Sequence, residues 1–223
     1  ALLILLSVLW GGSFFFNGVA LAALPPLTVG WMRVGLAAAA LWALAGAMGK
    51  TPTLSAAALR AYFGMGLLNN VIPFSLILWA QTRLPAGVAS ILNATTPLFT
   101  VIVAHWLTRD ERLNAGRAAG VGLGFLGVAA MMGGAGPAAL QADGPAMLAC
   151  LVAALSYALA GVFGRRFKRL GVSPLSTAAG QLTASTLMFA PMALMIDRPW
   201  TLAAPGAGPL AAVVGLALVS TAL

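Results

Sequence analysis

Polar groups that could bind a small molecule lie in the middle of two long apolar stretches of this sequence. Asn69 and Asn70 come shortly before Pro73, and the run Asn93-Ala94-Thr95-Thr96-Pro97 has the same pattern with hydroxyls added. A proline inside a helix removes one backbone donor and leaves a carbonyl free. The amides and hydroxyls beside it supply further donors and acceptors. The two stretches therefore predict a cavity that binds its ligand reversibly.

The same groups could instead hold neighbouring helices together. Asn and Thr side chains hydrogen-bond between membrane helices, for about 0.6 kcal/mol each on average. For any single residue, ligand binding and helix–helix contact are equally good explanations. The occurrence of both polar groups at one depth, each beside a proline, favours a cavity, because irregular backbone in a membrane is tolerated where it faces water or protein.

A positive charge and an indole ring are further candidates for ligand contact. Arg33 lies about seven residues into an apolar stretch, about 10 Å deep at 1.5 Å per residue, where it could attract a carboxylate or another anion. Its alternatives are snorkelling to the interface and pairing with a helix C-terminus. Trp10 stands beside Gly11-Gly12-Ser13 and could either stack on a ligand or serve in packing.

No residue set for catalysis or metal binding is visible. Cys150 and His105 are single residues of their types, and neither has a partner at a metal-ligand or nucleophile-base spacing. The acids are all expected in loops; they are Asp110, Glu111, Asp143 and Asp197. We therefore expect neither an enzyme nor a cofactor. Asp110-Glu111, between Arg109 and Arg112, predicts a solvated ion-pair cluster that caps the following helix.

The composition shows what must position these residues. Of 223 residues, 61% are hydrophobic and 7% are charged, against about 25% charged in a soluble domain. Mean hydropathy is +0.99. A soluble globule of this size cannot bury so much apolar surface, disorder requires the opposite composition, and one cysteine excludes a disulfide scaffold. An all-α polytopic membrane protein remains.

Eight apolar segments of spanning length, about 20 residues, are separated by Pro, Gly or charged dividers. The predicted segments are 2–22, 26–48, 59–81, 86–108, 114–134, 145–164, 174–196 and 207–223. The basic run Arg165–Arg169 is expected to follow the sixth helix as a loop. Gly116, Gly120 and Gly124 recur at a spacing of four, which predicts a helix-packing ridge. The eighth segment is cut short, so we expect a fragment of a longer protein.

The basic residues indicate the orientation. With a cytoplasmic N-terminus, nine of them fall on the cytoplasmic side and two on the other, and Arg33 within a helix completes the 12. The nine are Lys50, Arg60, Arg109, Arg112, Arg117, Arg165, Arg166, Lys168 and Arg169, and the two are Arg83 and Arg198. This is the positive-inside pattern, and it explains the net charge of +8 without nucleic acid.

Weak internal similarity predicts a repeat. Pro26-Leu27-Thr28 matches Pro174-Leu175-Ser176 at an offset of 148 residues, and 64–70 resembles 215–221 at an offset of 151. The second helix thus matches the seventh and the third matches the eighth, so the unit has five helices. Because five is odd, the second copy must be inverted, as in secondary transporters. We expect one unit over 1–134 and an incomplete one over 145–223, from ten helices in full.

Several motifs, in order, resemble EamA-type proteins of the drug/metabolite transporter superfamily. They are Leu9-Trp10-Gly11-Gly12-Ser13-Phe14, Trp31-Met32-Arg33, Asn69-Asn70-Val71-Ile72-Pro73-Phe74, Ala89–Pro97, Asp110-Glu111-Arg112-Leu113 and Gly120–Val128. Each is weak alone, and together they cover nearly the whole chain.

The resemblance implies two inverted five-helix repeats around a central cavity and export of small metabolites, such as amino acids, or of toxic compounds. Transferred by position, the expected substrate-binding residues are Asn69, Asn70, Asn93 and Thr96, with Trp10 and Arg33 beside them. The expected partners are a small-molecule substrate and the lipid bilayer, with protons as a candidate coupling ion and a homodimer as a candidate assembly. The expected location is the bacterial inner membrane. A structural or receptor-like bundle and an intramembrane enzyme are the alternatives.

Overall fold

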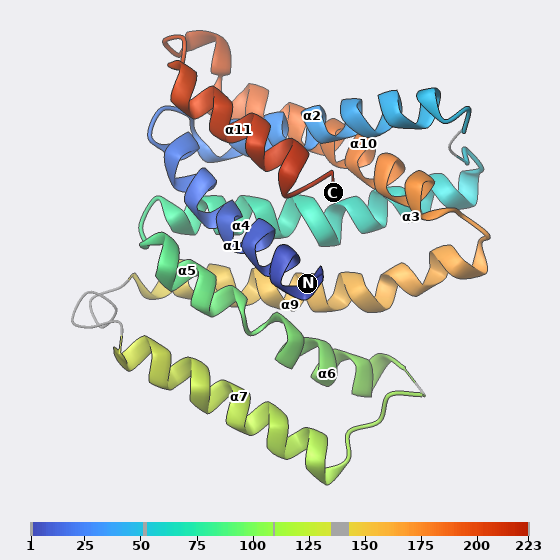
Figure 1. The fold of residues 1–223 in the computed structure, drawn as a ribbon, viewed down its shortest axis with the longest axis vertical. Coiled ribbons are helices and arrows are strands. Elements are labelled where there is room, and N and C mark those ends of the chain that lie inside the picture. The colour runs from blue at the N-terminus through green and yellow to red at the C-terminus, as the bar shows by residue number, and fades with distance from the viewer. Residues whose placement is uncertain (1, 51–52, 109, 135–142, 223) are drawn as a thin grey trace.

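The structure is a computed structural model that describes residues 2–50, 53–108, 110–134 and 143–222. All regular secondary structure in these ranges is helical, and the helices run roughly side by side (Figure 1). Six helical segments within them are long and apolar enough to cross a membrane, and a shorter apolar helix follows. The expectation of an all-α polytopic membrane protein is therefore confirmed.

The helical segments match the eight predicted ones closely. The first two are α1 (Leu2–Leu21) and α2 (Pro26–Ala47). The third is α3 (Ala56–Gly66), η1 (Leu67–Val71) and α4 (Ile72–Gln81), and the fourth is α5 (Ala86–Asn93) with α6 (Thr96–Leu107). The fifth and sixth are α7 (Ala115–Gly134) and α9 (Gly144–Arg169). The last two are α10 (Pro174–Met192) with η2 (Ala193–Asp197), and, after η3 (Pro199–Thr201), α11 (Ala207–Val219).

Local signals set most of these ends. Ser55, Asp143 and Ser173 each accept a backbone hydrogen bond at the start of a helix, which satisfies one of the donors left free there. Gly49 and Gly171 end α2 and α9 with φ of 63° and 65°, a conformation that glycine adopts without steric cost.

The expected loop at Arg165–Arg169 is wrong, because α9 continues to Arg169. Positive charges at the last turn of a helix interact favourably with its dipole, and long basic side chains can keep their charge in water while the stem packs. The guanidinium of Arg166 lies 3.4 Å from the centroid of the Phe163 ring. The basic cluster therefore forms the last turns of α9 instead of following the helix.

Two expectations about acidic residues also fail. Asp197 is the last residue of η2 and not part of a loop. The cap of α7 is Asn114, whose Oδ1 accepts from the backbone N–H of Arg117 at 2.8 Å, and not Asp110-Glu111. The two acids were expected to cap α7 because they are close to it in the sequence, but they pair with Arg165 of α9.

The second and seventh spans form the most extensive contact of the bundle, with α2 antiparallel to α10. Contacts run in opposite order along the two helices: Thr28 meets Asp197 and Trp42 meets Thr183. Farther out, α9 lies between α4 and the α5–α6 pair, and α7 forms one edge (Figure 1). The third and fourth segments thus pack against helices from the other half of the chain.

The predicted glycine ridge of the fifth span is largely wrong. A Cβ at Gly124 would collide with the Leu98 side chain of α6, whereas one at Gly120 would meet nothing within 4 Å. At Gly116 the nearest atom is the Asn114 side chain of the same segment. The spacing of four does place the glycines on one face, but α6 reaches that face only at Gly124.

Candidate functional site

The third span changes helical geometry at its two asparagines. The segment Leu67–Val71 is a turn of π-helix, in which the N–H of Ile72 bonds to the carbonyl of Leu67. Pro73 follows and supplies no N–H, so the carbonyl of Leu68 lacks its donor. The hydroxyl of Ser156 in α9 donates to this carbonyl at 2.7 Å. Turns of π-helix occur frequently at functional sites, and this one brings the third and sixth spans together.

The fourth span is interrupted in a comparable place. Residues 94 and 95 form a turn between α5 and α6, and Pro97 cannot donate to the carbonyl of Asn93. The hydroxyl of Thr96 donates to that carbonyl at 2.7 Å. The side-chain Oδ1 of Asn93 is buried and has no hydrogen-bond partner among the described residues. Buried polar atoms are rarely left unpaired, so this oxygen, like Asn17 Oδ1, Ser75 Oγ and Gln181 Oε1, is available to accept a hydrogen bond.

The neighbouring asparagines Asn69 and Asn70 differ in environment. Asn70 is 3% exposed, and its Nδ2 donates to the hydroxyl of Ser185 in α10 at 2.8 Å. That hydroxyl in turn donates to the carbonyl of Gln181 at 2.7 Å. Asn69 is half-buried, and no hydrogen bond joins its side chain to a described residue. Asn70 thus connects two helices, whereas Asn69 retains its hydrogen-bonding capacity.

Arg33 lies inside the bundle and not at its surface. It is 6% exposed, and its Nε donates to Oγ1 of Thr221 at 2.7 Å. The guanidinium lies 4.0 Å from the centroid of the Phe74 ring in α4. These contacts exclude snorkelling to the interface as the explanation of this charge.

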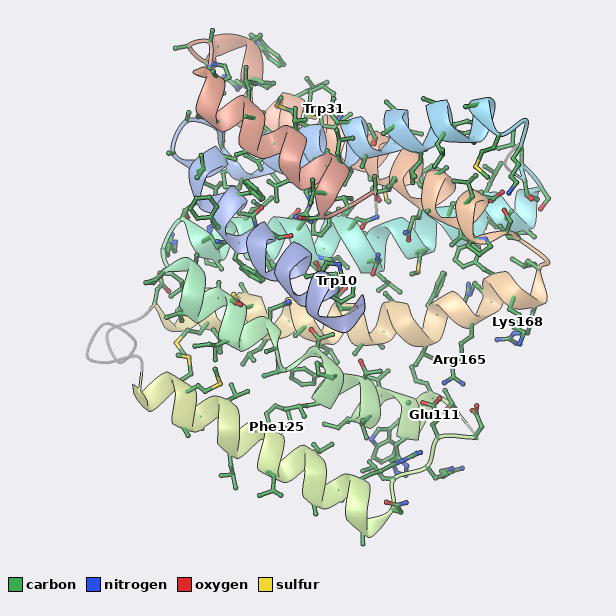
Figure 2. The ribbon with its side chains drawn as sticks, in the orientation of Figure 1. Trp10, Trp31, Glu111, Phe125, Arg165 and Lys168 are labelled. Atoms are coloured by element: carbon green, nitrogen blue, oxygen red, sulfur yellow. The ribbon has the colours of Figure 1, made fainter. Side chains whose placement is uncertain are left out.

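Trp10 is 66% exposed on α1, and Figure 2 marks its position near the middle of the bundle in that view. Of the six expected site residues, Asn93 and Thr96 are the only two that hydrogen-bond to each other within the described chain. The structure therefore places Asn69, Asn70, Asn93 and Thr96 at the helix breaks, with Arg33 held separately between α2, α4 and the end of α11.

Several polar residues of the bundle interior were not identified from the sequence. Asn17 of α1 is 2% exposed, and its Nδ2 donates to Oε1 of Gln81 at 2.7 Å. Ser156 and Ser185 supply the interhelical hydroxyls described above. Their positions near the middle of apolar segments were the available signal, but Ser is small and common enough that position alone does not single it out.

Ion pairs hold both ends of α9. At its start, Nη1 of Arg83 lies 2.6 Å from Oδ2 of Asp143. At its end, Arg165 contacts Asp110 at 3.0 Å and also Glu111, and Figure 2 shows Glu111 and Arg165 facing one another. Arg109 lies outside the described residues. The expected ion-pair cluster is therefore exposed to solvent, and it joins the loop before α7 to the end of α9.

Hydrogen bonds lower the pKa of both Asp110 and Asp143. For Asp110 the main cause is a hydrogen bond from its own backbone, and the hydrogen bond from Arg165 lowers the pKa further. For Asp143 the main cause is the hydrogen bond from Arg83, followed by the one from the N–H of Ala146. Both carboxylates are therefore held in the charged form.

His105 has a structural contact at the end of α6. Its Nδ1 accepts from the backbone N–H of Leu113 at 3.1 Å, which ties the helix to the following loop. Among the described residues, no group of three or more His, Cys, Asp or Glu could hold a metal ion. In the part of the chain that the structure describes, the buried polar side chains are amides, hydroxyls and one guanidinium, a set suited to non-covalent binding.

These features define a polytopic helical membrane protein with polar groups at interrupted helices in its interior. The model of the EamA-like transporter family matches residues 1–133. The chain therefore belongs to the EamA-like transporter family, whose members are membrane transporters and not enzymes.

Named relatives agree with this assignment. The "Uncharacterized transporter YoaV" of Bacillus subtilis (strain 168) is 25% identical over 174 residues, 76% of this chain and 58% of its own length. The "Probable amino-acid metabolite efflux pump" of Escherichia coli (strain K12) is 29% identical over 178 residues, 78% of this chain and 55% of its own. The "Uncharacterized inner membrane transporter YedA" of Escherichia coli (strain K12) is 26% identical over 218 residues, with shares of 96% and 67%.

The chain thus spans a little over half the length of the first two of these relatives. A solved crystal structure is similar over 98% of this chain and 73% of its own, with a TM-score of 0.70 and 22% sequence identity. At this identity the likeness shows the shared fold.

Proposed function

We propose that this chain belongs to a secondary transporter that exports small metabolites across the bacterial inner membrane by alternating access. The observation that carries the proposal is the pair of interrupted spans. The third breaks at Asn69 and Asn70, the fourth breaks beside Asn93, and the Asn93 side-chain oxygen is buried without a partner in the described chain. Irregular backbone with available polar groups is what a midplane substrate site requires.

In this proposal the substrate contacts the polar groups that the helices leave available. Asn69 and Asn93 supply amide donors and acceptors, Thr96 shapes the break, and Trp10 offers an exposed ring. Asn70 acts at the same depth by fixing the π-helical turn against α10. Amino acids and related metabolites are the first candidates, because a curated relative is named as a probable amino-acid metabolite efflux pump.

Alternating access would follow from two inverted five-helix units, over 1–134 and 145–223, that rock about this site, with the N-terminus in the cytoplasm. The antiparallel packing of α2 on α10 supports the inverted arrangement, because these are the spans that the sequence offset pairs. Protons are the proposed coupling ion, and a homodimer is a proposed assembly.

The competing proposal is a helical bundle without a substrate. It is favoured by the hydrogen bonds that join the third span to α9 and α10, which are those from Ser156 and Asn70. It explains these two residues, but it leaves the buried oxygen of Asn93 without a role.

Transport by the intact protein in proteoliposomes tests the proposal. Uptake and counterflow of labelled amino acids would be measured with and without a pH gradient, for the wild type and for Asn93→Ala, with Gly120→Ala as a control at an open surface position. We expect saturable transport that Asn93→Ala reduces at least about tenfold, since a hydrogen bond from an amide to a charged group of the substrate is worth about 1.5–3 kcal/mol. Equal transport by the variant and the wild type, with Asn93→Ala folded, would remove the proposed site.

A further inference from the structure

Arg33 is a buried positive charge for which the described residues supply no counter-ion. The ion pairs in the described part of the chain all lie at the two ends of α9, and Arg33 is 6% exposed in the interior. A buried charge is costly unless it is paired and hydrogen-bonded. An apolar residue of similar volume would serve packing better, so this position indicates binding.

The contacts of Arg33 leave its outer edge available. Only Nε donates to a described residue, in the hydrogen bond to Thr221, and Oγ1 of Thr221 donates in turn to the carbonyl of Leu216 at 2.7 Å. Phe74 covers one face of the guanidinium. Neither Nη group hydrogen-bonds to a described residue. Two parallel N–H bonds at the end of the fork therefore remain, and they match the two oxygens of a carboxylate.

Tyr157 of α9 adds a donor near this fork. It packs against the core cluster that contains Val34 of α2 and Phe74, the residue whose ring covers the guanidinium of Arg33. Its side chain is half-buried, and its hydroxyl has no hydrogen-bond partner among the described residues. A phenolic O–H can donate to an anion, so Tyr157 supplies a donor from a helix other than that of Arg33.

We propose that Arg33 and Tyr157 form an anion subsite that takes the carboxylate of a small metabolite. The proposal rests on the proposed transport function, because it names the substrate class of that transporter. The Nη edge of Arg33 holds both carboxylate oxygens and Tyr157 donates to one of them. Thr221 and Phe74 fix the plane of the guanidinium. Arg33 comes from the first expected unit and Tyr157 from the second, so a bound carboxylate contacts both.

Pairs of ligands that differ only at the carboxyl group test the subsite. Leucine and leucinamide, and threonine and threoninamide, would be compared as competitors of transport and as stabilisers against heat in detergent. We expect the wild type to prefer each acid over its amide at least about tenfold. Arg33→Gln should weaken the acids about 10- to 100-fold, as expected for lost hydrogen bonds to a charged group, with little change for the amides.

Further variants separate the two donors. Arg33→Lys should recover part of the preference for acids, because it keeps the charge and loses the fork. Tyr157→Phe should weaken the acids several-fold and leave the amides unchanged. Arg60→Gln removes an exposed arginine elsewhere on the chain and should match the wild type throughout. Equal losses for acids and amides in Arg33→Gln would overturn the subsite.

The unfolding temperature distinguishes the subsite from a structural role of Arg33, because the two roles predict opposite changes when Arg33 is replaced. Removing an unpaired buried charge should raise the unfolding temperature, so Arg33→Met is expected to be more heat-stable than the wild type and insensitive to leucine. A lower unfolding temperature for Arg33→Met would show a structural role and reject the subsite. If the wild type transports none of the panel but is stabilised by the acids through Arg33, the carrier proposal fails and the subsite stands. If transport proceeds unchanged without Arg33 and Tyr157, the carrier proposal stands and the subsite is rejected.

Discussion

Asp197 holds the start of a helix that begins far earlier in the chain, through a contact with Thr28 that spans 169 residues. One of its oxygens, Oδ2, accepts from the backbone N–H of Thr28 at 2.7 Å and from the Thr28 hydroxyl at 2.9 Å. Thr28 lies in the first turn of α2, where backbone N–H groups have no intrahelical partner. A carboxylate from the end of the seventh span thus caps the second span, and its charge also favours the N-terminal end of the helix dipole.

Substitutions of Asp197 should destabilise the bundle by an amount that depends on how much of this contact they remove. We expect Asp197→Ala to lower the free energy of unfolding by about 1–2 kcal/mol, the range for loss of a helix cap. Asp197→Asn retains an acceptor oxygen and loses only the charge, so about 0.5 kcal/mol is expected. Denaturant titration in mixed micelles measures both, and Thr28→Val isolates the hydroxyl. An Asp197→Asn variant as unstable as Asp197→Ala would show that the charge, and not the hydrogen bonds, dominates.

Gly180 should tolerate no side chain. A Cβ there would lie 2.6 Å from ring carbons of Tyr62. That ring stacks on Phe167 with centroids 5.7 Å apart, and its hydroxyl donates to the carbonyl of Thr53 at 3.0 Å, so it cannot easily move. We expect Gly180→Ala to cost about 1–3 kcal/mol of unfolding free energy, the range for overpacking.

The matched control for Gly180→Ala is Gly120→Ala, at a position where a Cβ meets nothing within 4 Å. It should be neutral or slightly stabilising, since alanine is the better helix former. Thermal unfolding of the two variants in one detergent makes the comparison. Similar unfolding temperatures would contradict the close approach of α3 and α10.

Alanine substitutions of the adjacent Asn69 and Asn70 should have different effects on stability and on transport. Asn70 is buried and bonded to Ser185, so Asn70→Ala should lower the free energy of unfolding by about 1–3 kcal/mol by leaving buried groups unpaired. Asn69 has no such bond to a described residue, so Asn69→Ala should leave stability within about 0.5 kcal/mol of the wild type and reduce transport. Measuring both quantities for both variants checks this, and the opposite pattern would exchange their roles.

The pair of Arg83 and Asp143 should make stability depend on pH in acid. The hydrogen bond from Arg83 lowers the pKa of Asp143 below its ordinary value of 3.8. Because the folded state binds the proton less readily than the unfolded state, the contribution is fully present above that ordinary value and is lost as the pH falls through the lowered pKa. The effect should be small, since Arg83 is half-exposed and exposed ion pairs contribute little.

Unfolding temperatures of the wild type and Arg83→Gln, followed from neutral pH into acid, measure this contribution. The difference between the two proteins should be constant near neutrality and shrink only below about pH 4. Asp143→Asn should remove the same pH dependence. A difference that persists unchanged into strong acid would mean that Arg83 acts through another contact.

The positions of the spans could be predicted from the sequence because they depend on local quantities. The transfer free energy of about 20 consecutive residues decides whether a segment enters the membrane, and prolines, glycines and charges mark its ends within the same window. The one large error, at Arg165–Arg169, has a local reason as well: charges are tolerated in a last helical turn when their side chains can reach water.

The tertiary structure decided which polar groups are already occupied. Asn69 and Asn70 are neighbours of identical type, and only the approach of Ser185, 115 residues away, distinguishes them. Gly120 and Gly124 lie on the same face of α7, and they differ only because α6 approaches that face at Gly124. The sequence showed that Arg33 lies deep in a span, but its contacts with Phe74 and Thr221 depend on which helix faces meet. Such contacts join segments far apart in the chain, so no local sum of residue preferences contains them.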